Sequence, residues 1–414
     1  MGGALGDDPD PLAQLGDALD LTAQDYRDRR GRLALTLQER GYGAMVVFGP
    51  ARVSYLTGFY FAATERPVAA LVSDTGDGTL FVPALEADHV RQQCPDLGDP
   101  VTYPEYPGGG SGEHPLLTLG RELRHMFPRA RALAADLGGY ESRWGYRGPR
   151  LEEAAGLPVH EHLEFVDDAR AIKSPAEIAL IREACHWGDY AHGLMQQALE
   201  IGSDEMLVSH ETSLRATRDM LAALGSRYVP KAREGLPANT MFIRGRNTAN
   251  PHGLHQTGGV QAGDILVTGA YGVVGGYESE LERTMFVGEP TPEQARWFGA
   301  MLAAQDAGMA ALKPGRPCHE VEQEVRAVLE AHGAMPYVRH HTGHTFGMEG
   351  HEHPFLDLDD PTEIRPGMIF SIEPGIYVPG LGGFRHSDTL VVTETGTERL
   401  SLYPRDLQSL TVPV

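Results

Sequence analysis

Hydrophobic positions recur at helical spacing over residues 22–41, and an apolar run at 44–48 follows directly. Two more apolar runs, 68–73 and 79–82, flank the turn sequence Asp-Thr-Gly-Asp-Gly, and a fourth lies at 132–136. A stretch with helical spacing, 115–126, precedes this fourth run. Strands that alternate with helices in this way predict a small α/β domain over residues 21–168. Residues 1–20 are rich in Gly, Asp and Pro, and we expect a mobile tail there.

A helix-start signal at Ser174 opens the second half of the chain. Ser174 is a good N-cap, Pro175 suits the first helical position, and Glu177 completes a capping box. We interpret this motif as a domain boundary only. The sequence predicts similar helix starts at Thr291 and after Pro317. Five strand signals occupy residues 240–244, 264–268, 277–287, 368–372 and 384–392. The pattern predicts an α+β domain over residues 169–414, with a curved, largely antiparallel sheet flanked by helices.

Composition excludes some classes of function. The formal net charge is -22, whereas nucleic-acid binding requires clustered Lys and Arg, so we expect no nucleic-acid partner. No apolar run approaches the roughly 20 residues that span a bilayer, and the acidic N-terminus lacks the pattern of a signal peptide. Three widely spaced cysteines are typical of reduced thiols. We therefore expect a cytoplasmic protein without a membrane partner.

An ordered set of motifs resembles one family over residues 160–414, and more weakly over 20–160. The motifs are RAIKSPAEI at the boundary, PHGLH (251–255), GDILVTGAYGVVGGYESELERTMF (263–286), HHTGHTFG (340–347), HE (351–352) and GMIFSIEPGIYVPGLGGFRHSDT (367–389). They resemble creatinase, prolidase and aminopeptidase P. This resemblance implies the pita-bread fold for the C-terminal domain.

The resemblance also implies a metal site, because the metallopeptidases of this family hold two divalent ions with two Asp, one His and two Glu. The matching positions here are Gly269, Glu280, His344, Glu373 and Ser387. Gly269 offers no ligand, and Ser387 offers only a neutral hydroxyl. Two carboxylates cannot balance two divalent ions in a buried site, so we do not expect a pair of ions.

The sequence favours the hypothesis of a metal-free site, because creatinase provides a precedent for metal-free chemistry in the same family. The run Leu281-Glu282-Arg283-Thr284 matches creatinase. By this resemblance His252 transfers protons and Glu282 and Glu373 hold a cationic group of the substrate. His344 would then be a hydrogen-bonding member of the site. His351, Arg66 and Glu280 are expected to contact the substrate, with Arg66 contributed by the partner subunit of a homodimer.

Three functions follow from these residues. The first is a metal-independent hydrolase that cleaves a C–N bond, of amide or amidine type, in a small cationic or zwitterionic substrate. The second is an Xaa-Pro-type dipeptidase or aminopeptidase with one divalent ion, Zn, Mn or Co, held by Glu280, His344 and Glu373, since one His and two carboxylates can form an open site. The third is a binding protein that has lost catalysis. Metal content and hydrolysis with and without a chelator distinguish the three.

Overall fold

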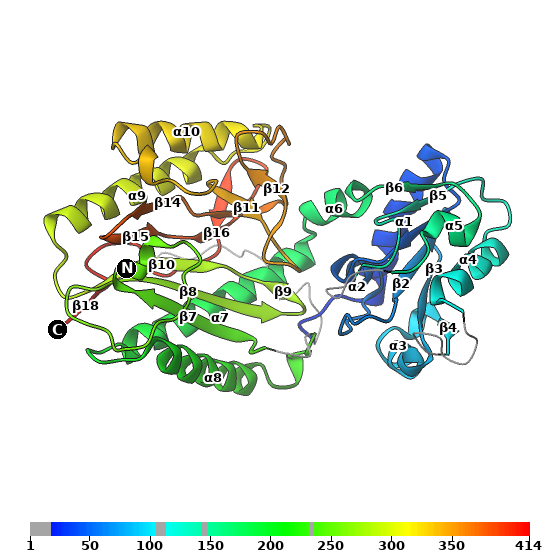
Figure 1. Cartoon of the computed structure of the whole chain (residues 1–414), viewed down its shortest axis with the longest axis horizontal. Coiled ribbons are helices and arrows are strands. Elements are labelled where there is room, and N and C mark those ends of the chain that lie inside the picture. The colour runs from blue at the N-terminus through cyan, green and yellow to red at the C-terminus, as the bar shows by residue number, and fades with distance from the viewer. Residues whose placement is uncertain (1–17, 105–112, 142–146, 232–234) are drawn as a thin grey trace, which may run out of the picture. The chain divides into compact units, whose positions relative to one another are not determined.

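The computed structural model describes residues 18–104, 113–141, 147–231 and 235–414 (Figure 1). The chain forms two compact units, residues 21–170 and residues 171–414, with residues 18–20 grouped with the second. The rest of the predicted tail, residues 1–17, lies outside the described residues.

The N-terminal unit is built on one sheet with the strand order β4-β3-β2-β1-β5-β6. Strands β1, β2 and β3 pair antiparallel, whereas β4, β5 and β6 join in parallel. The strands are β1 Ala44–Val47, β2 Ala69–Ser73, β3 Gly78–Pro83, β4 Val101–Tyr103, β5 Leu133–Ala135 and β6 Val159–Glu161. The helices are α1 Ala23–Arg40, α2 Pro50–Thr57, α3 Ala87–Gln93, α4 Pro115–Met126, α5 Leu151–Ala155 and α6 Glu164–Ala171.

Local signals set the elements of this unit. Helix α1 begins with a capping box between Thr22 and Asp25, and it ends at Gly41, whose φ of 75° is the left-handed conformation that glycine favours. The central strands are buried along their whole length, so they read as apolar runs without alternation. The predicted α/β arrangement is therefore confirmed within this unit.

The C-terminal unit carries four main helices: α7 Pro175–Ala198, α8 Glu205–Leu224, α9 Pro292–Ala311 and α10 Cys318–Ala331. The predicted capping boxes form at the starts of α7 and α9, where Ser174 and Thr291 accept hydrogen bonds from the backbone N–H groups of Glu177 and Gln294. Figure 1 shows α7 and α8 on one side of the strands and α9 and α10 on the other.

The strands of this unit form two larger sheets and a hairpin. The sheet orders are β18-β10-β8-β7, with β9 paired to β8, and β12-β11-β13-β16-β17, while β14 pairs with β15. The strands are β7 Ala238–Arg244, β8 Ile265–Val274, β9 Tyr277–Glu278, β10 Leu281–Val287, β11 Gly343–Thr345, β12 Glu352–Leu356, β13 Ile369–Ile372, β14 Gly375–Val378, β15 Gly382–Arg385, β16 Asp388–Val392, β17 Thr397–Arg399 and β18 Thr411–Val412. All these pairs are antiparallel except β10 with β18. The predicted α+β fold is confirmed.

Two strands that the sequence predicts as continuous are interrupted in the structure. The predicted strand 277–287 breaks at residues 279–280, and the predicted strand 384–392 breaks at 386–387. A single antiparallel bridge joins β10 to the second break, between Glu282 and Ser387. Each break therefore lies at a position that the family resemblance assigns to the metal site.

No helix in the described residues is both long and apolar enough to cross a membrane. The cytoplasmic location stays a prediction. Cys94, Cys185 and Cys318 are all buried.

Candidate metal and active site

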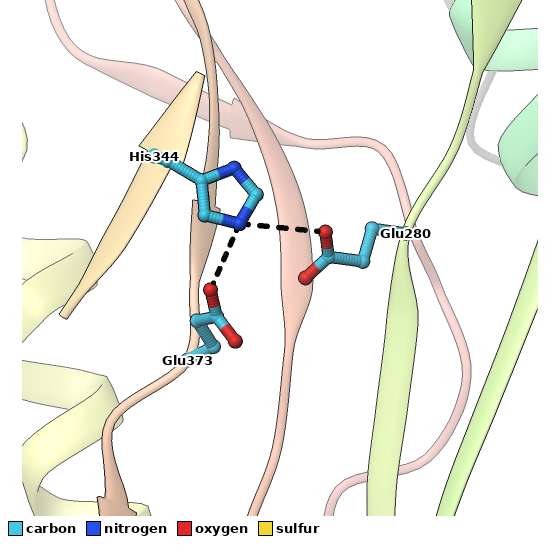
Figure 2. Close-up of side chains that lie close together, drawn as sticks. All are labelled: Glu280, His344 and Glu373. Atoms are coloured by element: carbon cyan, nitrogen blue, oxygen red, sulfur yellow. Dashed lines mark ion pairs between the residues drawn. The ribbon is translucent and has the colours of Figure 1, made fainter. Parts of the chain in front are cut away.

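Three side chains from separate segments of the chain converge in the C-terminal unit. Glu280 lies between β9 and β10, His344 lies in β11, and Glu373 directly follows β13. Figure 2 shows the imidazole of His344 directed at both carboxylates. One ligand atom from each residue lies within 4.8 Å of the others.

His344 is the centre of this cluster. Its Nε2 atom lies 3.0 Å from Oε1 of Glu373 and 3.8 Å from Oε2 of Glu280, which are ion-pair distances. Its Nδ1 atom lies 3.0 Å from the carbonyl oxygen of Thr345 and donates to it. In neutral imidazole this leaves the lone pair on Nε2, facing the carboxylates. Nε2 is buried and makes no hydrogen bond of normal geometry within the described residues.

The shifted pKa values of the three residues indicate that a positive charge is stabilised between the two carboxylates. Burial raises the pKa of Glu280 to about 8, and the charge of Glu373 adds to this effect. Burial opposes the charged form of His344, but Glu373 and Glu280 outweigh it and raise the pKa of His344 to about 9. Burial also opposes ionisation of Glu373, yet His344 lowers the pKa of this carboxyl to about 2. A proton on His344 or a metal ion can supply the charge.

The two other family positions lie beside the cluster without offering charged ligands. Gly269 pairs with Glu282 across β8 and β10. A Cβ atom at Gly269 would lie 3.4 Å from the Met241 side chain, so the position has room for a small side chain. Ser387 is fully buried, and its hydroxyl donates to Oε1 of Glu280 at 2.6 Å. The donor set therefore fits one ion, because a second would lack two carboxylates.

Glu282 is held by a residue that sequence analysis did not single out. Nη2 of Arg385 lies 2.5 Å from Oε1 of Glu282, and both side chains are largely buried. Nη1 of Arg385 donates to the hydroxyl of Tyr377 at 3.1 Å, and it lies 3.4 Å from the carbonyl oxygen of Pro251. The other oxygen of Glu282 has no hydrogen-bond partner within the described residues. Its predicted contact with substrate stays a prediction.

His252 lies at a hollow of about 420 Å³ that is also lined by Asn250, Pro251, Arg339 and His340. The side chain of His252 is exposed. The ring of His351 meets that of His344 at a centroid distance of 4.0 Å and a right angle. Burial lowers the pKa of His351, and the charge of His344 lowers it further, so His351 is neutral at neutral pH.

Arg66 belongs to the N-terminal unit. Its Nη1 atom pairs with Oε1 of Glu65 at 2.6 Å, and 31% of its side chain is exposed. A substrate contact from a partner subunit stays a prediction for Arg66, as does the homodimer.

Arg385 and Tyr377 are the main site residues that sequence reasoning missed. Both lie in the motif that supplied Glu373 and Ser387, two or four residues from those positions. Alternation along a strand could have placed Arg385 on the same face as Ser387, but its carboxylate partner lies 103 residues away in sequence.

Two family models match parts of this chain. The model of metallopeptidase family M24 matches residues 179–394, and the creatinase/prolidase N-terminal domain matches residues 29–140. The Xaa-Pro dipeptidase of Pyrococcus furiosus is 26% identical over 92% of this chain and 99% of its own length. The Xaa-Pro dipeptidase of Lactobacillus delbrueckii subsp. lactis is 27% identical over 91% and 97%.

Among solved structures, dipeptidase PepE from Mycobacterium ulcerans superposes with a TM-score of 0.79 and 26% identity, over 95% of this chain and all of that one.

The metal-free site favoured from the sequence is not supported by these findings. The relatives are dipeptidases, the matching family is one of metallopeptidases, and Nε2 of His344 faces two carboxylates as a ligand would. The alternative of a divalent ion fits these residues better. The model of metallopeptidase family M24 matches more than half of the residues of this chain. The chain therefore belongs to metallopeptidase family M24 and carries a creatinase/prolidase N-terminal domain.

Proposed function

We propose that the protein is a dipeptidase of the Xaa-Pro type that works with one divalent ion held by Glu280, His344 and Glu373. The observation that carries this proposal is the convergence of three ligand atoms within 4.8 Å, in a chain of family M24. Relatives that match nearly the whole chain are Xaa-Pro dipeptidases, which supports the choice of substrate.

Charge balance supports a single ion. The carboxylates of Glu280 and Glu373 offset one divalent cation, while Glu282 is already offset by Arg385. A second ion would add two uncompensated charges to a largely buried site, which is costly. One imidazole and two carboxylates suit Zn, Mn or Co and leave coordination positions open for substrate.

The residues of the chain divide the chemical work. A divalent ion in such a site supplies Lewis acidity towards a peptide carbonyl and lowers the pKa of water. His351 is neutral at neutral pH and can accept a proton beside the cluster. His252, at the edge of the adjoining hollow, can donate a proton to the leaving imino nitrogen of proline. Once its proton is displaced, His344 directs the Nε2 lone pair at the cluster, because Nδ1 donates to the Thr345 carbonyl.

The test combines metal content with peptide hydrolysis. Purified protein is depleted with a chelator, reloaded with Zn, Mn or Co, and assayed on Met-Pro and, for comparison, Met-Ala. We expect cleavage of Met-Pro that is lost on depletion and restored by one equivalent of an ion. Replacement of His344 by Ala should reduce the activity by at least about 100-fold, judged from the effect of perturbing outer-shell residues alone.

The matched control is His332→Ala, because the side chain of His332 is exposed at the end of α10, away from the cluster. Hydrolysis that survives complete depletion would contradict the proposal. Ion binding without hydrolysis of any dipeptide would favour a binding protein instead.

A further inference from the structure

The boundary motif contains a buried lysine that a domain boundary does not require. Lys173 precedes the N-cap of α7, and its side chain is only 1% exposed. The chain has only three lysines among its 35 basic residues, so a buried one is unusual here. Its backbone is fixed as well, because the N–H of Lys173 donates to the carbonyl of Gly367 at 3.0 Å.

The partner of Lys173 is the residue that follows His351. Nζ of Lys173 lies 3.2 Å from Oε2 of Glu352, and the Glu352 side chain is 5% exposed. Burying two charges is costly, and the attraction between them repays the cost only when further hydrogen bonds complete the arrangement. The ion pair therefore depends on the other contacts of Glu352.

The second carboxylate oxygen of Glu352 accepts hydrogen bonds from the loop that carries His351. Oε1 accepts the backbone N–H groups of Met348 and Glu349 at 2.9 and 3.2 Å. These bonds close residues 348–352 into a compact turn between β11 and β12, and His351 is part of this turn. The same loop is tied to β9, because the N–H of Glu278 donates to the carbonyl of Gly347 at 2.7 Å.

The ion pair is tightly packed against Gly347. A Cβ atom at Gly347 would lie 3.1 Å from Cε of Lys173 and 3.3 Å from Oε2 of Glu352. The compact ammonium group of lysine fits beside this glycine, whereas the broader guanidinium of arginine would need space that Gly347 does not leave. The loop is thus held between the lysine and β9, which leads directly to Glu280.

We propose that Lys173 is a positioning residue for the active site, acting through Glu352 to hold the loop of His351 against His344. This inference rests on the proposed function for its effect on catalysis, but not for its effect on the loop. The boundary motif then has two roles: it starts a domain, and through Lys173 it fixes the geometry of the site.

The test compares Lys173→Met with the matched control Lys313→Met, since Lys313 is exposed. Hydrogen exchange of a peptide covering residues 346–352 should be at least about tenfold faster in Lys173→Met, because the carboxylate that caps two N–H groups loses its counter-ion. For Met-Pro hydrolysis, kcat should fall by about 10- to 100-fold with KM nearly unchanged. Lys313→Met should match the parent in both.

Two double variants separate positioning from general stability. In Lys173→Met with Glu352→Gln both charges are absent, but the Gln oxygen still accepts the two N–H groups, so exchange and kcat should return towards the parent. In Lys173→Met with Glu352→Met no acceptor remains, so the loop should exchange fast and kcat should stay low. If Lys173→Met fails to fold, the comparison between these two doubles decides.

Unchanged exchange in Lys173→Met, or equal exchange and kcat in the two doubles, would overturn the inference. The exchange measurements need neither an ion nor activity. If the parent protein cleaves no dipeptide while loop exchange changes as expected, the proposed function fails and the positioning of the loop stands.

Discussion

Two arginine–carboxylate pairs on neighbouring residues of β10 have opposite characters. Arg283 and Asp388 are completely buried and 2.8 Å apart. Arg283 also donates to four backbone carbonyls, and Asp388 accepts from Gln305 and Ser401. Arg385 and Glu282 lie 2.5 Å apart, but Nε of the first and Oε2 of the second have no hydrogen-bond partner within the described residues.

This difference in unused hydrogen-bonding atoms indicates a structural role for the first pair and a functional role for the second. Alternation along β10 sends Arg283 to the opposite face from Glu282. A fully satisfied pair holds β10 and β16 together and has no capacity left for a ligand. A pair with unused donor and acceptor atoms beside Glu280, His344 and Glu373 is a costly arrangement for stability alone, and these atoms are available to a ligand.

The largest effect is expected at the structural pair. Replacing Arg283 by Met leaves the buried Asp388 carboxylate with less compensation, which should lower the free energy of unfolding by about 3–5 kcal/mol. Urea unfolding of the metal-free protein measures this. A loss below about 1 kcal/mol would mean that the pair is not the stabilising one.

A smaller but still large effect is expected from pH on ion binding. The pKa of His344 is raised to about 9 and that of Glu280 to about 8, so below these values an ion must displace their protons. The apparent Kd should therefore rise as pH falls, by about tenfold per pH unit for each proton displaced. Calorimetry in buffers of different ionisation enthalpy should detect between one and two protons released per ion at pH 7. Binding without proton release would contradict this account.

The smallest effects are expected at the site pair, with opposite signs. Arg385→Met leaves one uncompensated negative charge near the ion and should tighten its binding by about tenfold, or about 1.4 kcal/mol. Glu282→Gln leaves a positive charge and should weaken binding by a similar factor. The double variant should return close to the parent. Shifts of the same sign in both single variants would show that the pair acts through shape and not through charge.

Much of the fold follows from local signals in the sequence. The capping residues Ser174 and Thr291 fix the starts of α7 and α9, and apolar runs give the central strands of the N-terminal sheet. Helix α8 was not predicted, although its N-cap Asp204 is a residue type that favours a helix start.

The site could be predicted only in part, because its decisive contacts join distant residues. Family positions identified Glu280, His344 and Glu373, which the structure brings together. The pairing of Glu282 with Arg385 and of Lys173 with Glu352 spans 103 and 179 residues. No local pattern encodes such contacts. The strand breaks at 279–280 and 386–387 were also missed, because neither contains a Gly or Pro that would mark an interruption.

The most direct test of the central claim is the number of divalent ions that each chain binds with the three-residue cluster intact and with Glu373 replaced by Gln. Metal analysis after equilibrium dialysis against Zn, Mn or Co should give one ion per chain for the parent and a strongly reduced content for the variant. Two tightly bound ions per parent chain, or none, would contradict a single-ion site at Glu280, His344 and Glu373.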